Sequence, residues 1–362
     1  MCHRPECPTN DYGGVYVSWK IVPASTFAEH AARWRELHEA NSGSPLLSTD
    51  FVKALLDAFS TGQEILAWHE CDGQTDTMAI LATSRFGIWN TFQPSQAPLG
   101  LWLQRNAEAP IHLLPPLLRE LPGLGFMLGI TQCDPMLMQR PADNATLRTF
   151  DYIQTARITM GSYDSFDAYW EARGKNLRNN LKKQRNRLRQ DGIETRLEIC
   201  REPHQMALAV TDYARLECSG WKAADGTAVN ADNAQGSFYC RLLEAFAVRG
   251  AARVYRYWIG NKLGAMDLCI EGSNCIIVLK TAYDEGIARQ LSPALLMREE
   301  ACRGLFAEGR FERVEFYGRV MEWHLRWTDE IRSMYHLNGY RWIGLAQLHA
   351  VAQAKQNKAS TA

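Results

Sequence analysis

Two charged residues stand in otherwise apolar stretches of the second half of the sequence. Asp267 lies within the run 263–270, and Lys280 ends the run 275–279. Alternation along a strand turns Asp267 toward a partly buried face. A buried carboxylate is held in an ion pair, or it stands unpaired in a cleft, where a raised pKa suits a general base. The sequence leaves both alternatives open for Asp267, and likewise a structural or a substrate-binding role for Lys280.

A helix is predicted to begin at Ser292 and Pro293, a short distance after a strand. Serine is a favoured N-cap, and proline is favoured at the first helical position because its missing N–H would be unpaired there. The free N–H groups and positive dipole end of such a helix suit a phosphate or pyrophosphate group. A well-capped helix that binds nothing has the same sequence, and no G-x-G-x-x-G or Walker pattern distinguishes the two.

Polar and aromatic residues follow the last predicted strand of this half. His324 and Trp327 lie three residues apart and would share one face of a helix. A histidine exchanges protons near neutral pH, although a lone histidine is more often a structural hydrogen-bonding residue. Trp327 is expected either to form the floor of a sugar-binding cleft or to pack in the core. The nine histidines show no metal-ligand spacing, so we expect no metal site.

Residues 175–189 form a strongly basic helix in which seven of fifteen residues are Lys or Arg and none is acidic. Leu177, Leu181 and Leu188 give this helix one apolar stripe, which directs the cations outward. Three alternatives stay open: a solvated helix face, a clamp for an anionic substrate or cofactor, and a contact with nucleic acid.

The overall composition limits the classes of partner. Lys plus Arg and Asp plus Glu both number 40 in the 362 residues, so the formal net charge is zero. A balanced charge makes nucleic acid an unlikely main partner. The sequence has no run of about 18 apolar residues and no leader pattern at its start, so we expect no membrane span and a cytoplasmic location. The oligomeric state cannot be predicted.

The order of predicted elements occurs twice along the chain. In each half, two helices precede three strands joined by turns, then a loop, a helix and a further strand. We therefore predict an α/β (α+β) fold of two similar domains, each a mixed and mostly antiparallel sheet flanked by helices. The predicted domains cover residues 14–160 and 161–350, with flexible ends at 1–13 and 351–362.

Short motifs in the second half resemble those of the GNAT acyltransferases, in particular a CelD-type branch linked to bacterial exopolysaccharide and cellulose loci and related to Fem-type transferases. The resemblance covers roughly residues 166–342. It depends on the order of the motifs, which are the basic segment 176–183, Leu-Lys-Thr-Ala-Tyr-Asp at 279–284, Leu-Ser-Pro at 291–293, Phe-Tyr-Gly at 316–318 and Trp-Thr-Asp at 327–329. The chain has Ala294 where that branch usually has glycine, and His324 where it commonly has lysine.

This resemblance implies tandem GNAT-like domains, of which the first is a degenerate copy and the second carries the active site. It implies transfer of an acyl group, most simply acetyl, from acyl-CoA to an amine or hydroxyl of a small or saccharide-linked acceptor. On that basis we expect a donor loop, acid–base residues and an acceptor side. The donor loop comprises Tyr283, Asp284, Ser292 and Pro293. The catalytic residues are Asp267, Tyr317 and His324, and the substrate-binding residues are Lys280, Glu315, Arg319 and Trp327.

Two other functions are compatible with the same residues. One is a Fem-like transferase that takes its donor from aminoacyl-tRNA and binds RNA through the basic helix. The other is a GNAT-like module of polysaccharide assembly that has lost catalysis, which Ala294 favours. Binding of acetyl-CoA distinguishes the first proposal from these two.

Overall fold

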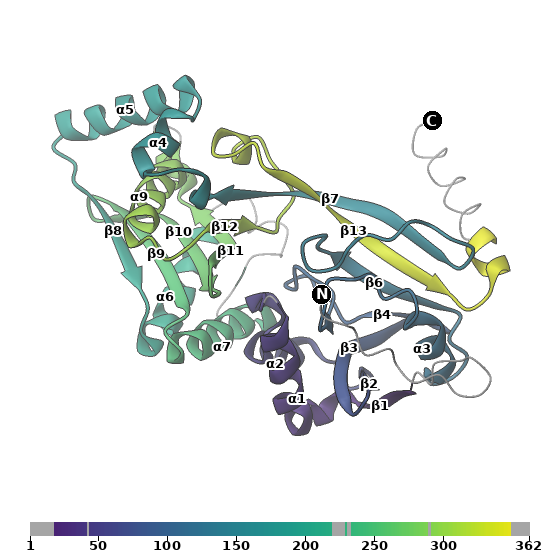
Figure 1. Ribbon diagram of the computed structural model, residues 1–362. Helices are drawn as coiled ribbons and strands as arrows, with labels where there is room; N and C mark the ends of the chain where they lie inside the picture. Colours follow the sequence, from purple (N-terminus) through teal and green to yellow (C-terminus); the bar gives the residue numbers. More distant parts are fainter. Residues whose placement is uncertain (1–17, 42, 219–228, 230–232, 289–290, 349–362) are drawn as a thin grey trace. The chain divides into compact units, whose positions relative to one another are not determined.

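A computed structural model describes residues 18–348 apart from 42, 219–228, 230–232 and 289–290 (Figure 1). The chain forms two compact units. Unit 1 comprises Met1–Ile153 with Ser333–Ala362, and unit 2 comprises Gln154–Arg332. No helix in the described part of the chain is long and apolar enough to cross a membrane. The predicted flexible ends, 1–13 and 351–362, lie outside the described residues.

Unit 1 contains a mixed sheet in the order β1-β2-β3-β4-β6-β13, with β5 beside β3. Strands β4 and β6 run parallel, and the other neighbouring pairs run antiparallel. The elements are β1 (Ser18–Pro23), α1 (Phe27–Ala40), α2 (Thr49–Phe59), β2 (Ile65–Cys71), β3 (Gln74–Arg85), β4 (Ile88–Thr91), β5 (Trp102–Gln104), α3 (Leu114–Glu120), β6 (Met127–Cys133) and β13 (Ile331–Tyr340).

Unit 2 repeats this pattern with the sheet order β7-β12-β11-β10-β9-β8. Here β11 and β12 are the parallel pair, and the other neighbours run antiparallel. The elements are β7 (Leu147–Thr159), α4 (Phe166–Glu171), α5 (Lys175–Gln190), β8 (Thr195–Cys200), α6 (Pro203–Cys218), α7 (Ala234–Val248), β9 (Ala252–Ile259), β10 (Lys262–Glu271), β11 (Cys275–Tyr283), α8 (Glu285–Ala288), α9 (Pro293–Glu308) and β12 (Arg313–Phe316).

Local sequence signals explain many of these elements. Ser48 caps α2, because its Oγ accepts the N–H of Phe51 at 3.4 Å. Asp72 and Gly73 both adopt positive φ, 52° and 76°, in the two-residue turn between β2 and β3. In α5 the predicted leucine stripe is buried, and it packs in one core with α9 and with the α9-facing side of the sheet. Helices α6 and α7 pack against the other face.

The predicted fold class is confirmed: each unit is a mixed, mostly antiparallel sheet flanked by helices. The sequence did not reveal β5, β7, β8 or β13. The compact units also differ from the predicted ranges at the C-terminal end. Residues 335–340 of β13 pair with β6, and residues from 333 onward belong to unit 1, whereas the sequence placed them in the second domain.

Candidate active site

The two parallel strands of unit 2 part from each other half-way along β11. Residues 275–278 of β11 pair with residues 313–316 of β12, and β11 then continues for five more residues without a β12 partner. The pairing of β11 with β10 shifts at the same place, because Val278 pairs with Cys269 and Lys280 with Leu268. Leu279 is therefore a bulged residue where the gap opens.

A buried ion pair joins α9 to β10 on the α9 face of the sheet. The Arg298 Nη1 of α9 lies 2.9 Å from the Asp267 Oδ2 of β10, and both side chains are almost fully buried. The Thr281 hydroxyl on β11 donates to Asp267 at 2.5 Å. The Arg298 guanidinium also lies 5.0 Å from the ring centroid of Phe316, the last residue of β12. Burial raises the pKa of Asp267, and the Arg298 charge and the Thr281 hydrogen bond oppose that rise.

His324 completes the packed layer on this face. Its ring stacks on Trp323 with centroids 3.5 Å apart and meets Phe316 edge-on at 5.2 Å. The N–H of Met321 donates to Nδ1 at 3.0 Å, so the proton of the neutral ring belongs on Nε2. Burial and the nearby Arg298 charge lower the pKa of His324 to about 4. At neutral pH this ring is therefore an uncharged donor through Nε2.

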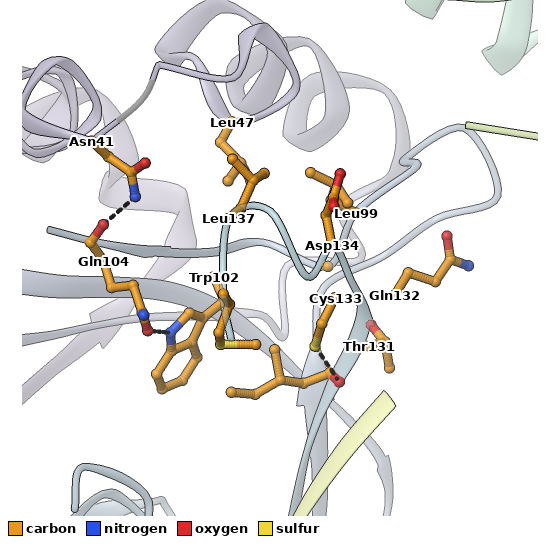
Figure 2. Close-up of a pocket in the computed structure, with 13 residues that line it drawn as sticks. Asn41, Leu47, Leu99, Trp102, Gln104, Thr131, Gln132, Cys133, Asp134 and Leu137 are labelled. Atoms are coloured by element: carbon orange, nitrogen blue, oxygen red, sulfur yellow. Dashed lines mark hydrogen bonds between the residues drawn. The ribbon is translucent and has the colours of Figure 1, made fainter. Parts of the chain in front are cut away.

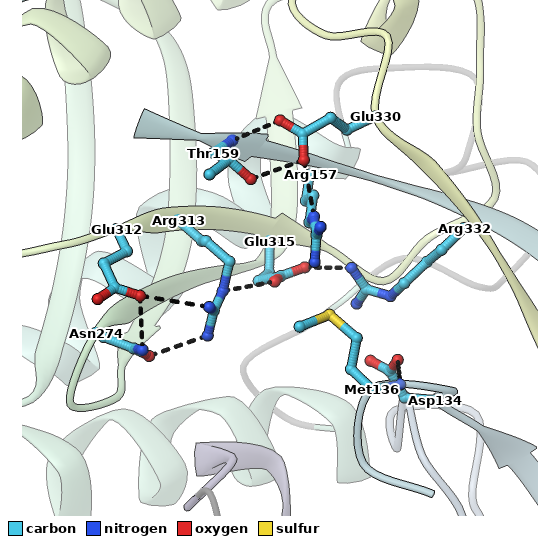
Figure 3. A network of polar contacts seen from close by, with 10 residues as sticks. All are labelled: Asp134, Met136, Arg157, Thr159, Asn274, Glu312, Arg313, Glu315, Glu330 and Arg332. Atoms are coloured by element: carbon cyan, nitrogen blue, oxygen red, sulfur yellow. Dashed lines mark hydrogen bonds and ion pairs between the residues drawn. The ribbon is translucent and has the colours of Figure 1, made fainter. Parts of the chain in front are cut away.

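The opposite face of the same strands carries a second set of predicted residues. Lys280 lies 3.5 Å from the buried carboxylate of Glu217 in α6. On β12, Glu315 is buried between Arg332 at 2.6 Å and Arg313 at 3.4 Å (Figure 3). The Arg332 guanidinium also lies 5.0 Å from the centroid of the Tyr317 ring. Lys280, Glu315 and Tyr317 thus share one face, whereas Asp267 and His324 lie on the other.

The predicted donor loop is built differently from the expectation. Asp284 accepts the N–H groups of Gly286 and Ile287 and so caps the short helix α8. Ser292 is at the N-cap of α9, yet its side chain does not cap the helix. Its Oγ accepts from Gln184 Nε2 of α5, and its N–H donates to Gln184 Oε1 at 2.7 Å. Tyr283 is exposed at the end of β11, and Pro293 is buried in the first turn of α9.

The basic helix α5 is partly used in structural ion pairs. Arg185 holds Glu299 and Glu300 of α9, each at 2.9 Å. Lys182 and Lys183 are exposed. Some cations of α5 therefore pair with α9, and others face solvent. The clamp for an anionic ligand and the contact with nucleic acid, both left open by the sequence, concern only the solvent-facing cations.

Two further predicted substrate residues occupy contrasting environments. Trp327 is fully buried, and its carbonyl accepts from Tyr169 Oη and Arg173 Nη1. Its ring therefore belongs to the core and does not form the floor of an open cleft. Arg319 is exposed in the segment after β12. No group of three His, Cys, Asp or Glu residues suited to a metal ion occurs in the described part of the chain.

Sequence reasoning missed four side chains that organise this region: Arg298, Thr281, Gln184 and Glu217. A signal existed for Arg298, because it lies four residues after Ala294 and three before Ala301, on the buried stripe of α9. The contacts of Gln184 with Ser292 and of Glu217 with Lys280 join residues more than 60 positions apart, and no local pattern marks them.

The corresponding gap of unit 1 is closed. Beyond the paired residues 88–90 and 127–129, the Oγ1 atoms of Thr91 and Thr131 are 2.7 Å apart. Gly100 inserts beside them, and its N–H donates to the Thr131 carbonyl at 3.0 Å. A Cβ on Gly100 would lie 2.2 Å from Thr91 Oγ1, so only glycine fits. The adjoining cavity, which Leu99, Trp102 and Cys133 also line, measures about 30 Å³, enough room for water (Figure 2).

The comparisons with known proteins agree with this architecture. Residues 175–324 match the acetyltransferase (GNAT) domain family. This match supports a transferase and covers most of unit 2, including α5, the parted strands and α9. No curated protein matches the chain at a significant level.

Two solved structures show how far the fold extends. The C-terminal domain of a putative lysylphosphatidylglycerol synthetase from Agrobacterium fabrum is 14% identical, with a TM-score of 0.51, and the match covers 90% of this chain and 96% of that one. FemX is 10% identical, with a TM-score of 0.55, and the match covers 91% and 99%. At these identities the likeness concerns the fold, and it spans both units.

Proposed function

We propose that the protein transfers an acyl group, most simply acetyl, from acyl-CoA to an amine or hydroxyl of a small or saccharide-linked acceptor. The observation that carries the proposal is the parting of β11 from β12 at the Leu279 bulge, inside the segment that matches the GNAT domain. A parted parallel pair offers backbone donors and acceptors that an amide-containing pantetheine chain can satisfy. The closed gap of unit 1 supports a donor site in unit 2 alone.

The donor is proposed to lie along β11, with its phosphates toward the start of α9. Ser292 and Pro293 begin that helix, and no side chain caps its first turn. Anions are stabilised at such an end by the N–H groups and the helix dipole. Gln184 fixes the position of Ser292, and Asp284, which follows Tyr283, caps α8. Backbone N–H groups of β11 beyond Val278 are suited to stabilise the thioester oxygen as charge develops on it.

The acceptor is proposed to approach on the face that carries Lys280, Glu315 and Tyr317. Its nucleophile attacks the thioester carbonyl, a new C–N or C–O bond forms, and the C–S bond breaks. In this scheme the Tyr317 hydroxyl gives its proton to the leaving thiolate and regains one from the nucleophile, so the proton count balances. The Arg332 guanidinium lies against the Tyr317 ring, and Glu315 holds Arg332 in an ion pair. Arg319, exposed beyond β12, is placed to meet an anionic acceptor.

The residues on the α9 face have a supporting role in this proposal. Asp267 holds Arg298 from β10, and both the Arg298 guanidinium and the His324 ring contact the Phe316 ring. In this proposal both residues, Asp267 and His324, keep the side chains beside the bound thioester in fixed positions. Trp327 supports these residues only from within the core.

Thiol release from acetyl-CoA, followed with a panel of amines and amino sugars, tests the proposal. We expect Tyr317→Phe to lower kcat by roughly a hundredfold or more, with unchanged acetyl-CoA affinity. Tyr152→Phe, an exposed tyrosine of unit 1, is the matched control and should leave turnover unchanged. Equal turnover in wild type and Tyr317→Phe would refute the role of Tyr317.

Two other outcomes would replace the proposed function. Binding of aminoacyl-tRNA that weakens with salt and depends on Lys182 and Lys183 would favour the Fem-like alternative, since exposed α5 cations would then neutralise phosphates. Absence of a thermal shift with any acyl-CoA, together with no tRNA binding, would favour a non-catalytic module.

A further inference from the structure

Large apolar side chains gather on the outside of unit 1, at the end of the sheet where β3, β6 and β13 meet loops. We name this set the Phe86 patch; it comprises Phe86, Leu124, Phe126, Trp342 and Ile343. The exposed fractions are 80% for Phe86, 44% for Leu124, 49% for Trp342 and 53% for Ile343. Single exposed apolar residues are ordinary, but a contiguous group is typical of an interaction surface.

The patch is continuous and rigidly built. The Phe126 ring lies between the other two aromatic rings, with its centroid 5.9 Å from Phe86 and 5.8 Å from Trp342. The backbone ties the same segments together, because Phe126 N–H donates to the Gly87 carbonyl and Arg341 N–H donates to the Phe126 carbonyl. The three rings therefore form a fixed row and do not depend on loop motion to come together.

The geometry of the turn points Phe86 outward. Arg85 and Ile88 pair across a two-residue turn formed by Phe86 and Gly87, and Gly87 has φ of 69°. A Cβ on Gly87 would lie 2.3 Å from the Phe126 ring, so the turn packs tightly on that ring through glycine. This close packing holds Phe86 at the tip of the turn.

Cations border the aromatic row. Arg85 directly precedes Phe86 and is exposed. Arg341 precedes Trp342, and its guanidinium lies 5.4 Å from the centroid of that ring. Nearby, α3 ends with Arg119 and Glu120, which cancel each other. The net charge beside the row is thus positive, in a chain whose total formal charge is zero.

We propose that the Phe86 patch docks the protein on the surface of a bilayer that contains anionic lipid. Aromatic rings favour the boundary between headgroups and acyl chains, and adjacent arginines gain from anionic headgroups. A projecting ring at a turn tip inserts among headgroups without needing a complementary pocket, which a protein partner would have to supply. The proposal does not depend on acyl transfer by unit 2.

Co-sedimentation with vesicles of phosphatidylglycerol and phosphatidylcholine in equal parts tests this docking. We expect the full-length protein to sediment with these vesicles and to remain in solution with pure phosphatidylcholine. The double variant Phe86→Ser/Trp342→Ser should lower the partition coefficient at least tenfold. Raising the salt concentration should weaken binding of the wild type, because it screens Arg85 and Arg341.

Matched controls separate docking from loss of folding. The variant Leu208→Ser/Val248→Ser removes two apolar side chains of unit 2 that are 56% and 75% exposed, and it should bind as the wild type does. The single variant Phe86→Ser tests the turn tip with little risk to the fold, and its melting temperature should be unchanged. Wild-type protein that stays in solution with anionic vesicles would overturn the proposal, as would equal binding by the double variant. A dimer seen by light scattering that the double variant abolishes, without vesicle binding, would assign the patch to protein contact instead.

Discussion

Replacing Asp267 by asparagine removes the charge that opposes Arg298 in the interior of unit 2. The two groups are 2.9 Å apart, and their side chains are 0% and 4% exposed. Leaving one member of a buried ion pair without its partner costs about 3–5 kcal/mol. For a domain of this size each kcal/mol lowers the melting temperature by about 2–4 °C, so we expect a decrease of roughly 6–20 °C.

Calorimetry or urea unfolding of the full chain measures this effect through the transition of unit 2. Asp143→Asn is the matched control, because that carboxylate is half-exposed and lies 4.0 Å from Arg148. Its effect should stay below about 1 kcal/mol. The double variant Asp267→Leu/Arg298→Met should recover most of the lost stability, since an apolar pair leaves no buried charge unpaired. A loss below 1 kcal/mol for Asp267→Asn, or no recovery in the double variant, would refute the interpretation of Asp267 and Arg298 as a stabilising buried ion pair.

Three further perturbations test separate parts of the structure. Gly100→Ala should destabilise unit 1 by about 1–3 kcal/mol in urea unfolding, because its Cβ would lie 2.2 Å from Thr91 Oγ1; Gly161→Ala, which meets nothing within 4 Å, should have little effect. The folded-state pKa of His324, about 4, lies below the ordinary 6.5, so its stabilising contribution is complete above pH 6.5 and is lost as the pH falls toward 4. His324→Gln should flatten the melting-temperature profile over that interval, and an unchanged profile would count against a buried neutral ring. Ser48→Ala removes the cap of α2 and should cost about 1 kcal/mol, whereas no change in unfolding free energy would show that the 3.4 Å bond contributes little.

Local patterns in the sequence were sufficient to predict most of the helices and the hairpins, but not the short helices α4 and α8. The leucine stripe of α5, the Ser48 cap of α2 and the Asp72-Gly73 turn each depend on residues within a few positions of one another. Such signals depend on periodicity and turn geometry, which a single segment contains. They also gave the repeated order of elements, and hence the fold class.

The long-range features could not be predicted in the same way. Strand β13 pairs with β6, about 200 residues earlier in the chain, and nothing in its own sequence specifies that partner. Ser292 has the sequence of a helix cap, but Gln184, 108 residues away, uses its hydroxyl instead. The sequence likewise grouped Asp267 with Tyr317, although alternation along β10 and β12 directs their side chains to opposite faces of the sheet. Tertiary pairing decides these positions, so they required coordinates.

Calorimetric titration of the full-length chain with acetyl-CoA tests the central claim most directly. Residues 279–283 of β11 have no β12 partner, whereas Thr91, Thr131 and Gly100 bridge the corresponding strands of unit 1. The account therefore predicts saturable binding of one equivalent per chain. Absence of binding, or saturation at two equivalents, would contradict it.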